Sequence, residues 1–182
     1  MQEIECKLRL DDRNGVIERL RRFGAVHIST QEEKNKIMDT ADRQLELSAK
    51  ALRLRTIAGV LGGVVTYKGA PEKSRYKSRE EIEFFVEDTD SFLIMMNRLG
   101  YTNVWQYEKK RSTWTLNSCS IVLDELPVLG DFIEIEAQNE EQIDSVLSAL
   151  GLCTKDHISF SYRELWIKHC VEHGKPIEDW LF

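Results

Sequence analysis

The stretch EIECKL, Glu3–Leu8, alternates charged with apolar side chains from its first residue to its last. A β-strand points successive side chains to opposite faces, so Glu3, Glu5 and Lys7 share one face and the apolar residues share the other. An ordinary half-exposed strand sets apolar residues against assorted polar ones. Here every polar position carries a formal charge, and both signs occur. The stretch therefore predicts a strand whose second face is unusually ionic.

The same two-residue period recurs along the chain, again with charges of both signs opposite apolar residues. Neighbouring segments are joined by glycine- or proline-containing turns, which are typical of hairpins. The pattern predicts an antiparallel sheet of at least seven strands. The predicted strands are Ile4–Leu10, Ala51–Ile57, Val64–Lys68, Arg79–Val86, Trp105–Leu116, Ser120–Asp124 and Asp131–Ala137.

Three amphipathic helices are predicted between the strands, over about 12–24, 88–100 and 139–151. Each begins near an Asp or Asn that can cap its first turn and stops at a glycine that can take the left-handed exit. Apolar residues at three- and four-residue spacing, with Phe23 and Leu99 among them, predict one buried stripe per helix. Strands and helices together indicate a single α+β domain without a linker.

The charged strand face has two explanations. A solvated outer face of mixed charges is the usual one. The helical stripes, however, need an apolar partner, and the apolar strand face is the large one on offer. If helices cover it, the charged face can curl inward into a wet barrel or tunnel, where opposite charges offset the cost of burying ions. The tunnel would then enclose seven acids and seven bases: Glu3, Glu5, Glu81, Glu83, Asp124, Glu134 and Glu136, with Lys7, Arg53, Arg55, Lys68, Arg79, Lys109 and Arg111.

The composition excludes several classes of protein. The 182 residues hold 25 Lys and Arg against 31 Asp and Glu, a net charge of −6, which disfavours duplex nucleic acid and anionic membrane surfaces as partners. No segment reaches the roughly 20 apolar residues of a membrane helix, and the first residues have no apolar signal-peptide core. The cysteines lie far apart, without metal-ligand spacing, so we expect free thiols and a cytoplasmic location.

A channel lined by Arg and Lys beside clustered carboxylates suits one class of ligand best. Guanidinium and ammonium groups bind phosphate oxygens, and Arg can do so with two parallel hydrogen bonds. Carboxylate clusters hold Mg²⁺ or Mn²⁺, which prefer oxygen ligands and usually share them with substrate phosphates. The tunnel explanation therefore predicts a phosphate-rich substrate and a divalent metal.

Motifs in this chain resemble the CYTH, or triphosphate tunnel metalloenzyme, superfamily. Glu3-x-Glu5-x-Lys7 is similar to the ExExK signature of that superfamily, and further matches follow in order. The likeness covers about residues 2–166, and we take residues 1–166 as one CYTH domain. The other matching segments are LRLR (Leu52–Arg55), TYKG (Thr66–Gly69), Arg79-x-Glu81-x-Glu83, EKKRS (Glu108–Ser112), VLDELPVLGDFIEIE (Val122–Glu136) and SYREL (Ser161–Leu165).

The resemblance implies a fold, a cofactor and roles for individual residues. Members fold as a closed eight-stranded antiparallel β-barrel, a tunnel with helices outside, and use Mg²⁺ or Mn²⁺ to act on triphosphates. The implied catalytic residues are Glu81, Glu83 and Lys7. The implied metal ligands are Glu3, Glu5, Asp124, Glu134 and Glu136. The implied substrate-binding residues are Lys7, Arg53, Arg55, Lys68, Arg79, Lys109 and Arg111.

The activity within the superfamily stays open at this point. We expect a metal-dependent phosphohydrolase acting on tripolyphosphate, ATP or thiamine triphosphate. A class IV adenylyl cyclase, which converts ATP to cyclic AMP and pyrophosphate, is the alternative, because Glu108–Glu136 looks most like those enzymes. Trp105, Trp114 or Tyr67 could stack an adenine, although core packing is the commoner role of such residues. A non-catalytic (poly)phosphate-binding module and a purely structural barrel are further alternatives.

Two segments depart from the superfamily pattern. Many members carry an aromatic-aromatic-Asp segment after the first helix, where this chain has Ile37-Met38-Asp39. Residues 167–182 fall outside the pattern, and the sequence gives them no role. Members often form dimers, so a homodimer is left open.

Overall fold

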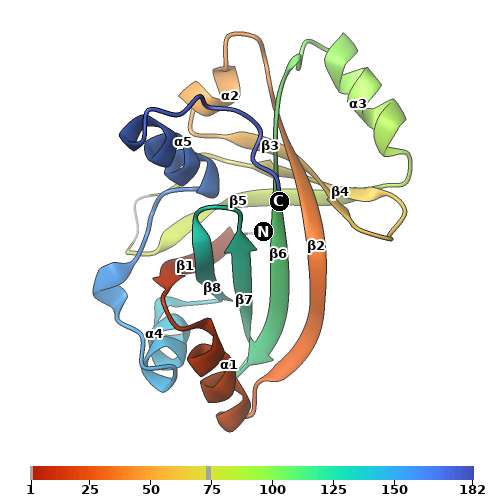
Figure 1. The fold of residues 1–182 in the computed structure, drawn as a ribbon. Coiled ribbons are helices and arrows are strands. Elements are labelled where there is room, and N and C mark those ends of the chain that lie inside the picture. Colours follow the sequence, from red (N-terminus) through yellow and green to blue (C-terminus); the bar gives the residue numbers. More distant parts are fainter. Residues whose placement is uncertain (1, 73–74) are drawn as a thin grey trace.

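Eight antiparallel strands close into a barrel in the computed structural model, which describes residues 2–72 and 75–182, with the side chains of residues 2 and 3 outside the described part (Figure 1). The order around the barrel is β1-β5-β4-β3-β2-β6-β7-β8. The predicted closed barrel is therefore confirmed. The strands are β1 (Gln2–Leu10), β2 (Val26–Asp39), β3 (Ala51–Ile57), β4 (Gly63–Lys68), β5 (Lys77–Val86), β6 (Asn103–Leu116), β7 (Cys119–Leu126) and β8 (Gly130–Ala137).

Five α-helices of the described residues pack outside the barrel, and the three predicted from sequence are among them (Figure 1). Asp12, Asp88 and Asn139 each accept a hydrogen bond from a backbone N–H in the first turn of the helix that follows, as the capping pattern predicts. None of the described helices has the length and apolar character needed to cross a membrane. The helices are α1 (Arg13–Arg22), α2 (Gln44–Leu47), α3 (Thr89–Arg98), α4 (Glu140–Ala149) and α5 (Tyr162–Glu172).

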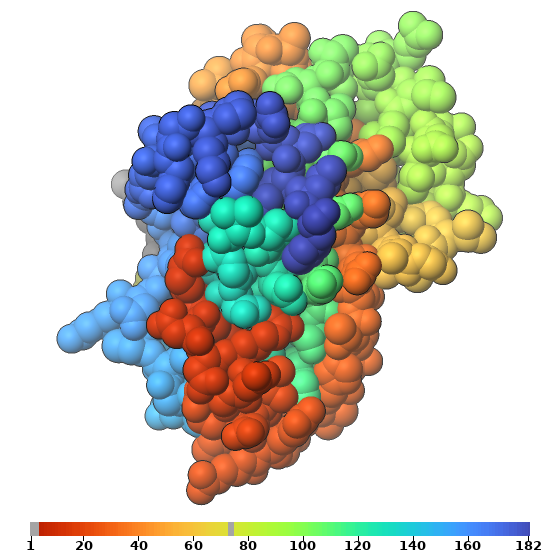
Figure 2. Space-filling model, viewed as in Figure 1, coloured from red at the N-terminus to blue at the C-terminus, as the bar shows by residue number. Residues whose placement is uncertain are grey.

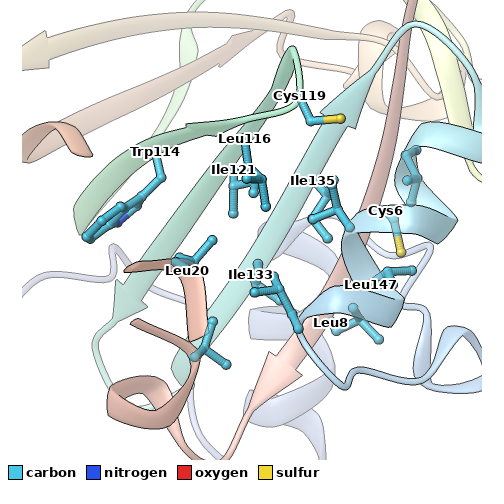
Figure 3. Packing of buried hydrophobic residues seen from close by; sticks show 14 of the residues in the cluster. Cys6, Leu8, Leu20, Trp114, Leu116, Cys119, Ile121, Ile133, Ile135 and Leu147 are labelled. Carbon is cyan, nitrogen blue, oxygen red and sulfur yellow. The ribbon is translucent and has the colours of Figure 1, made fainter. Parts of the chain in front are cut away.

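The largest apolar cluster lies on the outer surface of the barrel wall, under α1 and α4 (Figure 3). Cys6 of β1 and Ile135 of β8 pack there with Leu147 of α4, and Leu20 of α1 joins them; none of the four is more than 1% exposed. Burying one Leu or Ile side chain contributes about 1.5–3 kcal/mol to folding. Because the apolar side chains face outward toward helices, the alternate side chains of the same strands face inward.

Sequence analysis missed one strand and assigned two residues wrongly to the buried helix stripes. It predicted no strand between α1 and α2, yet β2 spans 14 residues there and pairs with both β3 and β6. Residues 31–36 of β2 are polar at every position, so the two-residue period is absent there. Phe23 and Leu99 lie beyond the last turns of α1 and α3 and are 50% and 66% exposed, outside the buried stripes.

The C-terminal residues pack against the barrel. α5 continues past residue 166, the end of the expected CYTH domain. The chain after α5 returns to β6, where Trp180 forms an isolated β-bridge with Tyr107. The Trp180 indole stacks on Trp166 of α5 at a ring-centroid distance of 4.9 Å and donates a hydrogen bond to the carbonyl oxygen of Pro127. Figure 2 shows these dark blue residues lying against the teal β7–β8 region. The segment that the sequence left without a role is thus part of the folded domain.

Candidate active site

A cavity of about 740 Å³ extends along the inside of the barrel. Its wall carries charges of both signs, contributed by seven of the described strands, as the tunnel explanation predicted. The predicted site residues that line it are Glu5, Lys7, Arg53, Arg55, Lys68, Arg79, Glu81, Glu83, Lys109, Arg111, Glu134 and Glu136.

Three carboxylates on neighbouring strands form an acidic trio: Glu5 of β1 with Glu134 and Glu136 of β8. The β1–β8 register places Glu5 directly opposite Glu136 and Lys7 opposite Glu134. One carboxylate oxygen from each residue of the trio lies within 4.8 Å of the others. Burial opposes ionisation of Glu134, but Lys7, 3.2 Å away, and Arg111 outweigh it and hold the pKa of Glu134 well below its ordinary value. Glu134 is therefore held ionised, and the three side chains together offer the oxygen ligands that suit Mg²⁺ or Mn²⁺.

Asp124, another predicted metal ligand, does not join the trio among the described residues. Asp124 is fully buried, and its carboxylate accepts hydrogen bonds from Lys109 Nζ at 3.0 Å and from Arg111 Nε at 2.7 Å. The Tyr162 hydroxyl donates a further hydrogen bond to it, at 3.0 Å. Asp124 thus orients cations of the tunnel wall, and its role as a metal ligand stays a prediction. The side chain of Glu3 lies outside the described part of the structure, so its role also stays a prediction.

Six Lys and Arg residues from four strands face the cavity together, and we call this set the clamp. Arg53 and Arg55 lie on β3, and Lys109 and Arg111 lie on β6. Arg111 Nη2 reaches Glu134 Oε2 at 2.6 Å, so it links the cations to the acidic trio. Lys68 of β4 and Arg79 of β5 complete the set. Such a row of guanidinium and ammonium groups can bind several phosphate oxygens at once.

Sequence analysis missed Glu33, the buried acid on which several of these cations converge. Glu33 of β2 is 1% exposed and lies 3.4 Å from Lys109 Nζ, 3.7 Å from Arg55 Nη1 and 4.0 Å from Arg111 Nε. Burial would raise its pKa, but the surrounding cations lower the pKa of Glu33 to about 2. Its signal in the sequence is weak, because Lys34 and Glu32 beside it are also charged.

Comparison with known proteins identifies the family. The family model that describes the CYTH domain matches residues 1–162. The chain belongs to the CYTH domain family. Among its relatives, a provisionally named adenylate cyclase of Methanocaldococcus jannaschii is 31% identical over 91% of this chain and 98% of that protein. The adenylate cyclase CyaB of Aeromonas hydrophila is 27% identical over 90% of this chain and 87% of that protein.

Solved structures agree with this assignment. A Pyrococcus horikoshii protein superimposes with a TM-score of 0.79 and 27% identity, over 92% of this chain and 99% of that one. The closed barrel seen here is therefore shared by a relative of almost the same length. The resemblance that the ExExK signature indicated is confirmed at the level of the CYTH family.

The two glutamates of the CYTH RxExE segment contact cations of the clamp. Glu81 forms ion pairs with Lys68 and with Arg79, the latter at 3.1 Å. Glu83 accepts a hydrogen bond from the Thr66 hydroxyl at 2.6 Å, and half of its side chain is exposed. Both carboxylates face the cavity on β5, the strand that pairs with β1 of the acidic trio. Their assignment as catalytic residues stays a prediction.

Of the three aromatic residues weighed as base-stacking groups, Trp105 and Trp114 are buried in the apolar core, whereas Tyr67 of β4 is half-buried. Trp114 belongs to the outer core cluster and donates a hydrogen bond to the Ser112 hydroxyl at 2.9 Å. Trp105 is buried in the cluster under α5, where it stacks on Tyr107 at a ring-centroid distance of 5.3 Å. Among the described residues, the aromatic side chains that line the cavity are Tyr76, Tyr107, Phe160 and Tyr162.

Proposed function

We propose that this CYTH chain is a divalent-metal-dependent phosphohydrolase that binds a triphosphate inside its tunnel and hydrolyses it. The observation that carries the proposal is the juxtaposition, in one cavity, of the acidic trio and a row of Arg and Lys side chains. A volume of about 740 Å³ is within the range of small-molecule sites and can take a triphosphate with or without an organic group. Tripolyphosphate, ATP and thiamine triphosphate are the candidate substrates.

The charge balance of the tunnel supports a requirement for metal. The inward-facing Lys and Arg residues are nearly balanced by inward-facing Glu and Asp residues, and ion pairs such as Lys7–Glu134 already occupy them. A triphosphate near neutral pH carries about four negative charges, which the protein alone would leave largely uncompensated. Mg²⁺ or Mn²⁺ on the acidic trio would supply the missing positive charge and polarise the reacting phosphoryl group.

The residues of the chain then have distinct parts in the reaction. The clamp binds and orients the phosphate oxygens, and it neutralises charge that builds up on them in the transition state. Its central members are Arg53, Arg55, Lys109 and Arg111. Lys7 lies beside the trio and contacts the same end of the substrate. Glu81 or Glu83 positions the attacking water by accepting its proton.

Cyclisation is the second candidate function, and the relatives favour it. Both relatives described above are named adenylate cyclases. A cyclase needs the ribose 3′-hydroxyl near the α-phosphorus and a site for the base. The cavity wall near α2 supports this candidate, because the apolar residues Ile37, Met38 and Leu45 lie there next to the charged part of the tunnel.

One assay distinguishes the two candidates. The purified chain is given tripolyphosphate, ATP or thiamine triphosphate, each with Mg²⁺ and with Mn²⁺, and the products are separated. Orthophosphate is the expected product. Formation of pyrophosphate together with cyclic AMP from ATP would overturn the hydrolysis proposal in favour of the cyclase. Tight binding without turnover would favour the non-catalytic binding module.

The metal role of the trio is tested with Glu5→Gln. This change removes one negative charge from the trio while keeping the size of the side chain, so we expect metal-dependent turnover to fall by at least about 100-fold. Circular dichroism checks that the barrel still folds. Unchanged turnover in folded Glu5→Gln protein would remove Glu5 from the metal site.

A further inference from the structure

Lys77 is a cation of the tunnel wall that the sequence did not single out. It is the first residue of β5, and the β1–β5 register pairs it with Glu5. On its other side, Glu5 pairs with Glu136 of β8. Three adjacent strands therefore carry Lys77, Glu5 and Glu136 in one row, which faces the cavity. The Lys77 Nζ atom lies 3.4 Å from Glu5 Oε1, and its side chain is 11% exposed.

The cations around the acidic trio are held in different ways. Lys7 contacts Glu134, donates a hydrogen bond to the carbonyl oxygen of Phe160 at 3.2 Å, and lies over the Tyr162 ring at 4.2 Å. Arg111 is tied to Asp124 as well as to Glu134. Lys7 and Arg111 are thus each held by groups outside the trio as well as by Glu134. The contact described for Lys77 is the one with Glu5, a member of the trio itself.

A divalent ion on the trio would conflict with this position of Lys77. Mg²⁺ binds carboxylate oxygens at about 2.0–2.1 Å, so an ion on Glu5 would come close to an ammonium group that already lies 3.4 Å from the same carboxylate. Like charges at such a distance repel strongly in a partly buried site. The Lys77 side chain is long and flexible, and the cavity into which it can turn is the one proposed to hold the triphosphate.

We propose that Lys77 is an exchangeable counterion: it neutralises Glu5 while the metal is absent, leaves Glu5 when Mg²⁺ or Mn²⁺ binds, and then contacts the phosphate oxygens of the substrate. This inference rests on the proposed function. It gives Lys77 two opposite effects, because the same ammonium competes with the metal and attracts the triphosphate. Metal and triphosphate should then strengthen each other's binding by one common factor, since such coupling is reciprocal.

The test is Lys77→Met, which keeps the length of the side chain and removes its charge. Mn²⁺ binding is followed by the electron paramagnetic resonance signal of the free ion, without any substrate. We expect the variant to bind Mn²⁺ on the order of tenfold more tightly than the wild type, because the competing charge is gone. In saturating Mn²⁺, we expect its affinity for tripolyphosphate, measured by calorimetry under conditions too brief for turnover or with a non-hydrolysable analogue, to fall by a similar factor.

Two further variants separate this inference from a general effect of charge. Lys77→Arg keeps the positive charge and should bind Mn²⁺ as the wild type does. Lys68→Met removes a cation that pairs with Glu81 rather than with the trio, so it should weaken tripolyphosphate binding and leave the Mn²⁺ affinity unchanged. Circular dichroism establishes that each variant is folded.

Each outcome has a definite meaning. Mn²⁺ affinity of Lys77→Met equal to or weaker than that of the wild type would overturn the role of Lys77 and leave the proposed function in place. Equal tightening in Lys68→Met would also overturn it, because the effect would then come from net charge alone. Failure of the wild type to bind Mn²⁺ would instead overturn the metal site of the proposed function.

Discussion

Glu33 shows how one buried acid can organise several cations. Its carboxylate lies within 4.0 Å of side chains from β3 and β6, so the clamp is drawn together from both neighbours of β2. A buried ion is tolerated when its charge is compensated, and removing one partner leaves the others uncompensated. Glu33 therefore positions Arg55, Lys109 and Arg111 without itself lining the cavity.

The lowered pKa of Glu33 predicts how stability depends on pH. Its pKa is about 2 in the folded protein against 4.5 for an ordinary Glu. A lowered pKa means that the ionised form favours folding, so this contribution is complete above about pH 4.5 and is lost as pH falls toward 2. The difference corresponds to about 3 kcal/mol.

Denaturant unfolding at pH 7 and pH 3, on the wild type and on Glu33→Gln, measures this contribution. We expect the variant to be less stable at pH 7 and to lose less stability between the two pH values. An identical pH dependence in both proteins would contradict the charge-organising role of Glu33.

The C-terminal segment is the element whose role changes most between sequence and structure. Trp180 is 2% exposed and stacks on Trp166, and its backbone N–H donates to the carbonyl oxygen of Gln106. Tyr107, on which Trp180 also stacks, lines the cavity. The last residues of the chain thus support one wall of the tunnel from behind.

Trp180→Ala should destabilise the domain strongly. Replacing a buried Trp by Ala costs about 3–5 kcal/mol, since the removed ring leaves a cavity behind. Phe182→Ala is the matched control, because Phe182 is an aromatic residue two positions away that is 55% exposed. Thermal unfolding monitored by circular dichroism compares the two. A loss of similar size in both variants would show that Trp180 has no special place in the core.

Elements were predictable from sequence where their signal is local. The caps at Asp12, Asp88 and Asn139 and the alternation of β1 and β8 are read within a few residues. β2 gave no such signal, because both of its faces are polar over residues 31–36: Glu33 and Asn35 on the inner face are buried, whereas the Lys34 side chain between them is 69% exposed. Its burial therefore depends on residues far away in the sequence.

The residues of the candidate site were likewise predictable where a local sequence pattern marks them. Inward-facing charges on alternating strands were found, whereas Glu33 on β2 was not. Lys77 was missed because the predicted strand began at Arg79, two residues after the observed start of β5. The contacts of Trp180 and Tyr162 were also missed, since they join the C-terminal residues to strands more than 30 residues away.

At the scale of the whole molecule, the near balance of charges inside the tunnel governs ligand binding. A triphosphate alone brings several uncompensated negative charges, whereas a triphosphate with a divalent metal brings few. A ligand that binds the folded state at 100 times its dissociation constant adds about 2.7 kcal/mol to stability.

We therefore expect tripolyphosphate to raise the melting temperature strongly only when Mg²⁺ or Mn²⁺ is present. Thermal scans with tripolyphosphate, with and without EDTA, measure the difference, and orthophosphate serves as the control anion. The same shift with and without EDTA would contradict the metal requirement. A homodimer and a cytoplasmic location stay predictions at this scale.

Most strands of the barrel have an ionic inner face and an apolar outer face, and this division has a consequence for how such a protein can change. Packing of the helices on the barrel wall depends on one set of positions, including Cys6 and Ile135. The proposed binding of metal and substrate depends on the positions between them, including Glu5 and Glu134. Mutations at the inward-facing positions, which are every second residue of a strand, can therefore alter ligand recognition without disturbing the packing of the helices on the barrel. The two faces of one strand can thus diverge nearly independently during evolution, so that ligand recognition changes while the fold is kept.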